Sequence, residues 1–379
     1  MIKKYSYFAF FAFGFFVMIL PSALPLAMKE FGIDYSQSGY VMMLGTAGYI
    51  GGSLICALFA HKIGLKRIAI LGSLISAAGL FYFFFVHDFL NLSIANFATN
   101  IGMGFIETGI GALIGSSEEN VSSTLNKVNA LFALGSFVSP FVVAFFIKYG
   151  FNWQVSYLLG SVIALISFVV SLKIENVKER PVVSAKKFNA FSGLFIMIYA
   201  MIGIYVGYEA TYSSWITTFL TNFRHINVAT AALSSAIFWM GMFVGRLLAS
   251  YIKVRNEIWL IFIVAFSLSG VIFSIAIPQF YISMFFVFFS GLFFASTYPT
   301  IQLMLIERAG SGIGNLMGIF VFFVGIGATL AQWVVSSFSN AFGILAGFSI
   351  IPVMITVELM LSISMERKNS HNRMENRSI

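Results

Sequence analysis

Three carboxylates stand inside long apolar stretches of the sequence: Glu107, Glu209 and Glu358. An ionised carboxylate at the centre of a lipid bilayer costs about 2.5–3.5 kcal/mol on insertion scales, so such a residue usually faces the interior of a helix bundle. Burial favours the neutral form of a carboxyl group, which suits a residue that loads and releases a proton. The role of each carboxylate therefore depends on its neighbours.

Glu107 is the strongest candidate for a proton-coupling residue. Asn96 and Asn100 precede it by eleven and seven residues, a spacing that places all three on one face of an α-helix. Such a polar stripe favours a wetted face inside a bundle. The alternative is a hydrogen bond between helices that only holds the bundle together, worth about 0.6 kcal/mol on average.

Glu209 is surrounded by aromatic residues. Its neighbours along the chain are Tyr205, Tyr208, Tyr212 and Trp215. Aromatic rings can stack on the apolar face of a sugar while their polar tips form hydrogen bonds, and a carboxylate accepts strongly from hydroxyl groups. This pattern predicts a substrate site, with an aromatic belt at the outer membrane interface as the alternative.

The other charges in apolar runs are expected near the cytoplasmic face. Glu358 is predicted near the inner end of the last span, shortly before Arg367, where pairing at the helix end explains it. Arg246 is expected to close a cytoplasmic gate, through a pair with Glu307, rather than to bind substrate.

Neutral polar side chains at useful depth complete the predicted substrate contacts. They are Asn100, Asn126, Asn129, Tyr298 and Gln302. Amides and aromatic rings suit an uncharged polyol better than an organic anion, which would more naturally meet a basic side chain at mid-span.

The elements that carry these residues are predicted to be membrane-spanning helices. Of the 379 residues, 59% are hydrophobic and only 9% are charged. A soluble domain carries roughly 25% charged residues, so this chain has too few to cover a surface that faces water. Apolar runs of about 20 residues are long enough to cross the hydrocarbon core as helices. The predicted spans are 5–27, 39–60, 68–88, 91–114, 126–147, 153–173, 190–221, 230–252, 257–277, 279–305, 312–337 and 340–363.

The basic residues indicate the orientation of these spans. With twelve spans, eighteen of the 22 Lys and Arg residues fall on one side, three on the other, and Arg246 lies inside a span. The positive-inside rule then places both termini in the cytoplasm, and we expect an inner (cell) membrane protein. Because the basic residues recur in short clusters between apolar runs, no nucleic-acid partner is expected.

The spans divide into two sets of six. The most polar internal segment separates them, and the predicted organisation is an N-terminal six-helix bundle at 1–173, a cytoplasmic linker at 174–189, a C-terminal six-helix bundle at 190–363 and a cytoplasmic tail at 364–379. Small residues four apart let helices approach closely, and they recur in the second and eighth spans: Gly48 with Gly52, and Gly241 with Gly245. We therefore predict two pseudo-symmetric six-helix bundles, an architecture of transporters with the substrate site at the interface.

One loop carries a resemblance to a known superfamily. The segment His61-Lys-Ile-Gly-Leu-Lys-Arg67 resembles the loop motif of the major facilitator superfamily, with His61 in place of the usual acid. The resemblance implies the major facilitator fold and a gating role for Lys62, Gly64 and Arg67. Gly245-Arg246 is similar to the second-half counterpart, which adds Arg246 to the gating residues.

Further stretches resemble the fucose–galactose–glucose:proton symporter family. They are Gly102-Met-Gly-Phe-Ile-Glu107-Thr108 with Leu125-Asn126 and Gly135, Tyr205-Val-Gly-Tyr-Glu209 with Trp215, Phe238-Trp-Met-Gly241 with Gly245-Arg246, and Tyr298-Pro299-Thr300. The acidic residue of the family's first span has no equivalent here, where Pro21, Ser22 and Pro25 stand instead. The resemblance implies alternating-access symport of a sugar-like solute with a proton, by a chain we expect to act as a monomer in the lipid bilayer.

Other classes of function fit the sequence less well. The chain has no Gly-x-x-x-x-Gly-Lys segment followed by Ser or Thr, so no ATP-driven pump is predicted. The single cysteine, Cys56, and four scattered histidines predict no metal site, and no cofactor and no enzyme activity are expected. A drug or metabolite exporter of the same superfamily and an uncoupled facilitator remain as alternatives.

Overall fold

The computed structural model describes residues 1–117, 121–175, 193–249, 255–309 and 313–375, and these contain helices and no strand. The helices are α1 (Ile2–Val17), α2 (Ile19–Phe31), α3 (Tyr35–Ile63), α4 (Leu65–Tyr82), η1 (Phe83–Phe85), α5 (Phe89–Ser117), α6 (Val121–Lys148), α7 (Val155–Leu172), α8 (Gly193–Asn222), α9 (Val228–Ala249), α10 (Asn256–Ala276), α11 (Phe280–Phe294), α12 (Thr297–Ala309), α13 (Ile313–Phe342), α14 (Ile344–Phe348) and α15 (Ile350–Glu375).

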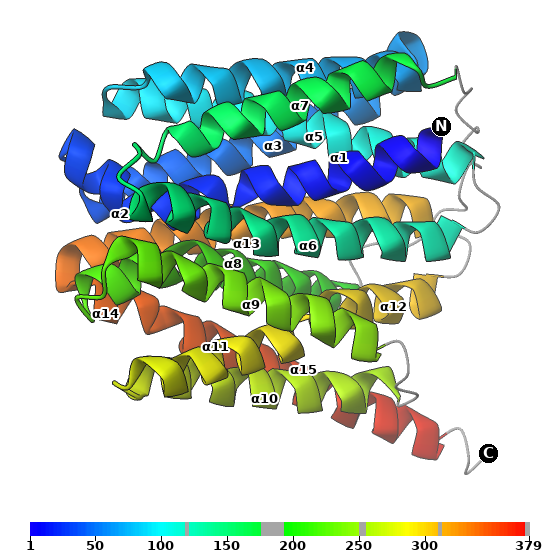
Figure 1. Ribbon diagram of the computed structural model, residues 1–379. Helices are drawn as coiled ribbons and strands as arrows, with labels where there is room; N and C mark the ends of the chain where they lie inside the picture. The colour runs from blue at the N-terminus through cyan, green and yellow to red at the C-terminus, as the bar shows by residue number, and fades with distance from the viewer. Residues whose placement is uncertain (118–120, 176–192, 250–254, 310–312, 376–379) are drawn as a thin grey trace.

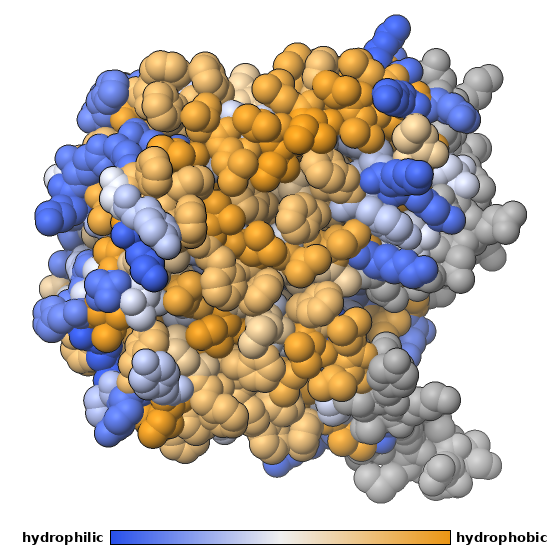
Figure 2. Space-filling view, viewed as in Figure 1, coloured by the Kyte–Doolittle hydropathy of each residue, from blue (hydrophilic) through white to orange (hydrophobic). Residues whose placement is uncertain are grey.

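The described residues form twelve segments that are long and apolar enough to cross a membrane, which confirms the predicted span number. On the face shown in Figure 2, apolar side chains make a broad band across the middle of the molecule, and polar residues gather toward its two ends. Large apolar side chains of the spans such as Leu90, Phe285 and Phe322 are more than half exposed. Lipid is the surrounding that makes this exposure favourable, and the chain is a multi-pass membrane protein.

Three of the spans are built from two α-helices each, and a proline explains each of these three breaks. Pro21, Pro299 and Pro352 follow the breaks α1–α2, α11–α12 and α14–α15. A proline has no N–H and its ring clashes with the carbonyl four residues earlier. Those carbonyls belong to Val17, Ala295 and Phe348, the residues at which α1, α11 and α14 end or are capped. Pro140, in contrast, lies inside the continuous helix α6.

The two sets of six spans repeat the same packing. In the first set α1 packs on α6, α3 on α5 and α4 on α7; in the second, α8 packs on α13, α9 on α11 and α10 on α15. The two sets meet along α3 with α13 and along α6 with α9, and they occupy the upper and lower parts of Figure 1. The predicted linker 174–189 lies largely outside the described residues, so the domain boundaries stay a prediction; α15 continues past the predicted start of the tail.

Glycine pairs hold equivalent helices in close contact. A Cβ added at Gly48 or Gly52 would lie 2.4 or 2.2 Å from a backbone carbonyl oxygen of α5. At Gly241 and Gly245 it would lie 2.2 Å from a backbone carbonyl oxygen of α11 in both cases. Only a residue without a side chain fits such contacts, so the pairs seen in the sequence pack the second span on the fourth and the eighth on the tenth.

The two sets of spans are in contact at the end of the bundle away from the termini. α1 begins and α15 ends at the same end of the molecule (Figure 1). At the opposite end, Asn222 donates a hydrogen bond to the Tyr35 hydroxyl at 3.0 Å. Nearby, a Cβ on Gly39 of α3 would lie 1.9 Å from Ser336 Oγ of α13. We call this end, with Tyr35, Gly39, Asn222 and Ser336, the far end.

Candidate functional site

Glu107 lies on α5 and faces α3. The Tyr49 hydroxyl of α3 donates a hydrogen bond to Glu107 Oε2, and the Tyr49 ring stacks on Phe13 of α1 with centroids 6.2 Å apart. The Glu107 side chain remains half-buried although it lies well inside its span. One fixed donor and partial access leave the carboxyl able to change its protonation state or meet a polar solute.

Glu209 lies on α8 in the second set of spans and is also half-buried. Arg246 of α9 and the Tyr205 hydroxyl, one turn away on α8, interact with it electrostatically. Arg246 also donates a hydrogen bond from Nη1 to the backbone carbonyl of Asn129 in α6, at 3.0 Å. The basic side chain therefore links α9 to the first set of spans close to this acid.

Tyr298 of α12 lies within electrostatic range of both acids. Its hydroxyl interacts electrostatically with both Glu107 and Glu209, and with the Tyr49 hydroxyl. Its half-buried ring packs edge-to-face on Phe320 with centroids 5.6 Å apart, and half-buried Gln302 follows one turn later. We call Tyr49, Glu107, Glu209 and Tyr298 the central polar cluster, which takes two members from each set of spans.

Aromatic residues link the two sets of spans beside this cluster. Phe132 of α6 contacts Phe13 on one side and the Trp239 ring of α9 on the other, with centroids 5.0 and 5.5 Å apart. The Trp239 indole donates to the Met18 sulfur at 3.1 Å, at the break between α1 and α2.

Three predicted substrate contacts on α8 point elsewhere. The buried Tyr212 hydroxyl is hydrogen-bonded to Ser274 Oγ of α10 at 2.8 Å. The buried Trp215 indole donates to Gln332 Oε1 of α13 at 2.6 Å, near Tyr35 at the far end. Tyr208 is fully buried against Phe294, with ring centroids 4.8 Å apart. In this arrangement none of the three is available to a solute at the central polar cluster.

The predicted asparagines have mixed positions. Asn100 Nδ2 donates to the Asn96 carbonyl at 2.8 Å, and Asn96 Nδ2 donates to the Val41 carbonyl of α3, also at 2.8 Å. Asn96 therefore bridges α5 to α3, whereas Asn100 bonds within α5. Asn129 is exposed, and the side chain of Asn126 lies outside the described part of the chain.

The predicted gating loop forms a sharp turn between α3 and α4. Gly64 has a φ of 86°, a conformation that side-chain-bearing residues rarely adopt. Lys62 and Arg67 are exposed, and the side chain of His61 is not described. The expected pair of Arg246 with Glu307 is not found among the described residues: Glu307 accepts from Asn256 at 2.7 Å and lies 4.0 Å from Arg308.

Sequence reasoning missed Tyr49 and misplaced Glu358. Tyr49 directly follows Gly48 in the middle of an apolar run, and a polar hydroxyl at that depth is the signal in the sequence that points to it. Glu358 was expected at the inner end of its span, paired with the helix end. It is instead fully buried near the middle of a span that reaches Lys368.

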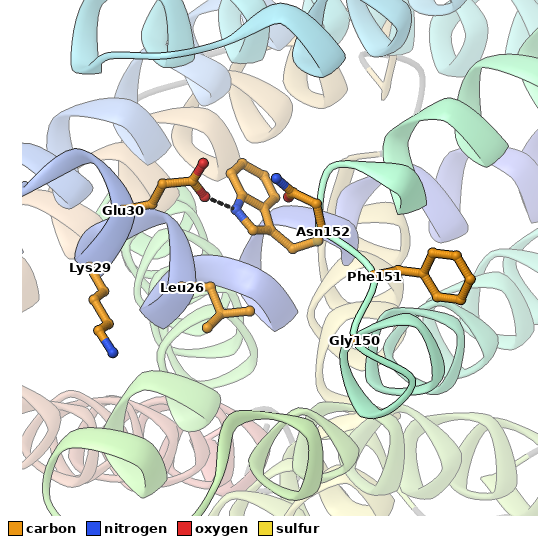
Figure 3. Close-up of a pocket in the computed structure, with 7 residues that line it drawn as sticks. Leu26, Lys29, Glu30, Gly150, Phe151 and Asn152 are labelled. Atoms are coloured by element: carbon orange, nitrogen blue, oxygen red, sulfur yellow. Dashed lines mark hydrogen bonds between the residues drawn. The ribbon is translucent and has the colours of Figure 1, made fainter.

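A separate pocket opens at the far end of the first set of spans (Figure 3). It has a volume of about 510 Å³ and lies between the end of α2 and the turn before α7. Trp153 Nε1 donates to Glu30 Oε2 at 2.6 Å in its wall, while Lys29 and Phe151 lie at its rim. No member of the central polar cluster lines it.

A family model described as Major Facilitator Superfamily matches residues 6–332. The chain belongs to the major facilitator superfamily. This confirms the resemblance seen in the sequence and the predicted all-α fold of twelve membrane helices.

Named relatives and solved structures extend this result. A glucose/galactose transporter of Brucella abortus is 24% identical over 367 residues, covering 89% of this chain and 88% of the relative. The glucose/mannose transporter GlcP of Bacillus subtilis is 22% identical over 270 residues, covering 67% of this chain and 66% of that relative's length. A D-xylose–proton symporter matches in fold with a TM-score of 0.80 at 12% identity, covering 95% and 96% of the two chains. The transporter FucP in its outward conformation matches with a TM-score of 0.64 at 14% identity, covering 96% and 98%. Because the relatives are transporters, the expectation of a transporter rather than an enzyme is confirmed.

Proposed function

We propose that this protein is a symporter that moves a sugar or sugar-like polar solute together with a proton by alternating access. The observation that carries the proposal is the central polar cluster, in which one acid from each set of spans lies within electrostatic range of Tyr298. The sugars transported by the two relatives and the proton coupling of the xylose symporter support the same assignment.

Glu107 is the proposed proton-coupling residue. A charged carboxylate in a membrane span is costly to move through a dry, closed state, whereas a protonated one is not. Tyr49 donates to the carboxylate and so stabilises it while the site is open to water. Protonation of Glu107 with solute bound would therefore permit the two sets of spans to rock, and loss of the proton would return the site to its starting state.

Glu209 and Tyr298 are the proposed solute contacts nearest the centre. A carboxylate can accept from two hydroxyl groups of a polyol at once, and the Tyr298 hydroxyl lies within electrostatic range of Glu209. Gln302, Asn100 and Asn129 are further proposed contacts of the solute path, as is Asn126. Tyr208, Tyr212 and Trp215 could join only after α8 turns in its bundle.

Alternating access requires contacts between the two sets of spans to form at one end and break at the other. At the far end these are the Tyr35–Asn222 hydrogen bond and the approach of Gly39 to Ser336. Toward the opposite end of the bundle, where both termini lie, Arg246 donates a hydrogen bond to the backbone carbonyl of Asn129. Lys62, Gly64, Arg67 and Arg246 are the proposed gating residues, in a monomer that lies in the inner membrane with both termini in the cytoplasm.

The proposal is tested by uptake of D-glucose into proteoliposomes that contain the purified protein. An inward proton gradient should drive accumulation above the equilibrium level, and a collapsed gradient should abolish it. Accumulation that follows a sodium gradient alone would contradict proton coupling. Glucose-stimulated efflux without accumulation under any gradient would favour the uncoupled facilitator, and uptake driven by an outward proton gradient would favour the exporter.

Glu107→Gln should abolish accumulation while glucose counterflow persists, because the neutral side chain mimics the protonated form permanently. Glu307→Gln is the matched control, since Glu307 is exposed at the end of α12. If Glu107→Gln still accumulates glucose in a proton gradient, the coupling assignment is wrong.

A further inference from the structure

Glu358 lies on the buried face of the last span. The buried residues of α15 recur with a helical spacing: Ile351, Ile355, Glu358, Ser362 and Met365. Glu358 is 0% exposed, and the candidate span around it runs from Ile344 to Lys368. The carboxyl group is therefore directed at neighbouring helices at mid-span, away from both ends of the membrane helix.

The carboxyl group of Glu358 lacks a compensating charge or hydrogen bond in the described part of the chain. Neither of its two oxygens accepts or donates a hydrogen bond within the described residues, and neither is reached by solvent. Arg255 pairs with Glu257 and Glu366, and Arg308 pairs with Glu257, all at the inner ends of α10, α12 and α15. A charged carboxylate without a partner is among the costliest groups to bury, so this site is suited to the neutral acid.

Few titratable groups face Glu358 from the helices around it. α15 packs on α8, α10 and α14. Among their described residues, α14 has no titratable group, and the carboxylate of α10 is Glu257, which is held by Arg308 at 2.6 Å. From α8 the Tyr208 hydroxyl approaches the Glu358 carboxyl, yet no hydrogen bond of normal geometry forms and the hydroxyl has no partner among the described residues.

Two tyrosines lie between Glu358 and the central polar cluster. The Tyr208 ring meets the Tyr205 ring edge-to-face with centroids 5.2 Å apart. The Tyr205 hydroxyl donates to the Phe294 carbonyl at 2.9 Å and interacts electrostatically with Glu209. Glu358, Tyr208, Tyr205 and Glu209 thus follow one another on α15 and α8, and in this conformation the Tyr208 hydroxyl forms no hydrogen bond with either neighbour.

We propose that Glu358 is a second proton-binding site, which holds a proton in this conformation and exchanges it with Glu209 through Tyr208 and Tyr205. The transfer balances without another reactant. The Glu358 carboxyl gives its proton to the Tyr208 hydroxyl oxygen, and the Tyr208 hydroxyl at the same time gives its own proton to the Tyr205 hydroxyl oxygen. Tyr205, once turned from Phe294, repeats the step, and the proton ends on the Glu209 carboxylate. Any part of this site in coupled transport rests on the proposed function.

Infrared spectroscopy of the full chain in lipid nanodiscs tests the proposal at neutral pH. The carbonyl band of a protonated carboxyl group should be present in the wild type and missing from Glu358→Gln. Transfer into D2O should shift this band as the proton exchanges. Tyr208→Phe should slow the shift at least about 10-fold, because a positioned proton-transfer group typically contributes more than that. Tyr199→Phe is the control, since Tyr199 is another buried α8 tyrosine whose hydroxyl has no partner among the described residues.

Identical spectra for the wild type and Glu358→Gln would show that Glu358 is ionised and would overturn the site. A band that never shifts in D2O, or that shifts equally fast in Tyr208→Phe, would overturn the exchange path. If Glu358→Gln does not fold, Glu358→Asp should move the band instead of removing it. These readouts need no transport, so a protein that fails to accumulate glucose but keeps the band contradicts the proposed function alone.

Discussion

Each membrane-embedded acid of this protein has a different environment, and the environment decides what it can do. Glu107 has one tyrosine donor and partial access. Glu209 has a basic side chain within electrostatic range, which lowers the cost of keeping it charged. Glu358 has neither a donor nor access among the described residues. We therefore propose reversible protonation for Glu107, hydroxyl binding for Glu209 and, in this conformation, a bound proton for Glu358.

Glu209→Gln is expected to weaken D-glucose binding about 10-fold or more, because hydrogen bonds to a charged acceptor contribute about 1.5–3 kcal/mol. Equilibrium binding of radiolabelled glucose to purified protein measures this change. Glu307→Gln should bind glucose as the wild type does. An unchanged dissociation constant in Glu209→Gln would remove Glu209 from the substrate site.

At the scale of helices, glycines and prolines set how the spans can move against one another. The glycine pairs on α3 and α9 bring backbones into contact within each set of spans, which makes those contacts stiff. The contact of α3 with α13 crosses between the two sets and depends on Gly39 at the far end. Breaks at Met18, at Ala295–Ser296 and at Ser349 divide three spans into segments that can tilt separately.

Gly39→Leu is expected to open the far end, because a side chain there would overlap Ser336 of α13. Spin labels attached at positions 29 and 225, through Lys29→Cys and His225→Cys in a Cys56→Ala background, report the separation of the two sets of spans. The distance between the labels is measured by pulsed electron paramagnetic resonance. In Gly39→Leu, most molecules should show a longer distance between the two spin labels than in the wild type. Gly51→Leu on the same helix is the control, since a Cβ at Gly51 has no atom within 4 Å. Equal distance distributions for both variants would contradict a role for Gly39 in closing this end.

At the scale of the whole molecule, the apolar band and the charge asymmetry act together. The band of apolar side chains sets the depth of the bundle in the membrane, and by the positive-inside rule the end richer in basic residues is expected in the cytoplasm. Because α1 begins and α15 ends at the same end of the bundle, one measurement on the C-terminus reports the orientation of every span.

A green fluorescent protein fused after residue 379 is expected to fluoresce in cells, because it should remain in the cytoplasm. Alkaline phosphatase fused at Gly150, in the turn between α6 and α7, should be active because that turn should lie on the outer side. The reverse pattern would contradict the predicted orientation and would place the far end in the cytoplasm.

Local properties of the sequence determined the number of spans and the glycine pairs that let helices approach closely. Run length and small-residue spacing act within one or two helices, so they could be interpreted without a tertiary structure. The same periodicity placed Asn96, Asn100 and Glu107 together on α5.

Only the tertiary structure decided which side chains meet. The rotation of each helix about its axis depends on packing against all its neighbours, which one apolar run does not encode. The sequence grouped Tyr208, Tyr212 and Trp215 with Glu209 because they are near it in the chain, but a helix directs them toward different neighbours. The depth of Glu358 depended on where the last span ends, and Tyr49 became the partner of Glu107 only when α3 packed on α5.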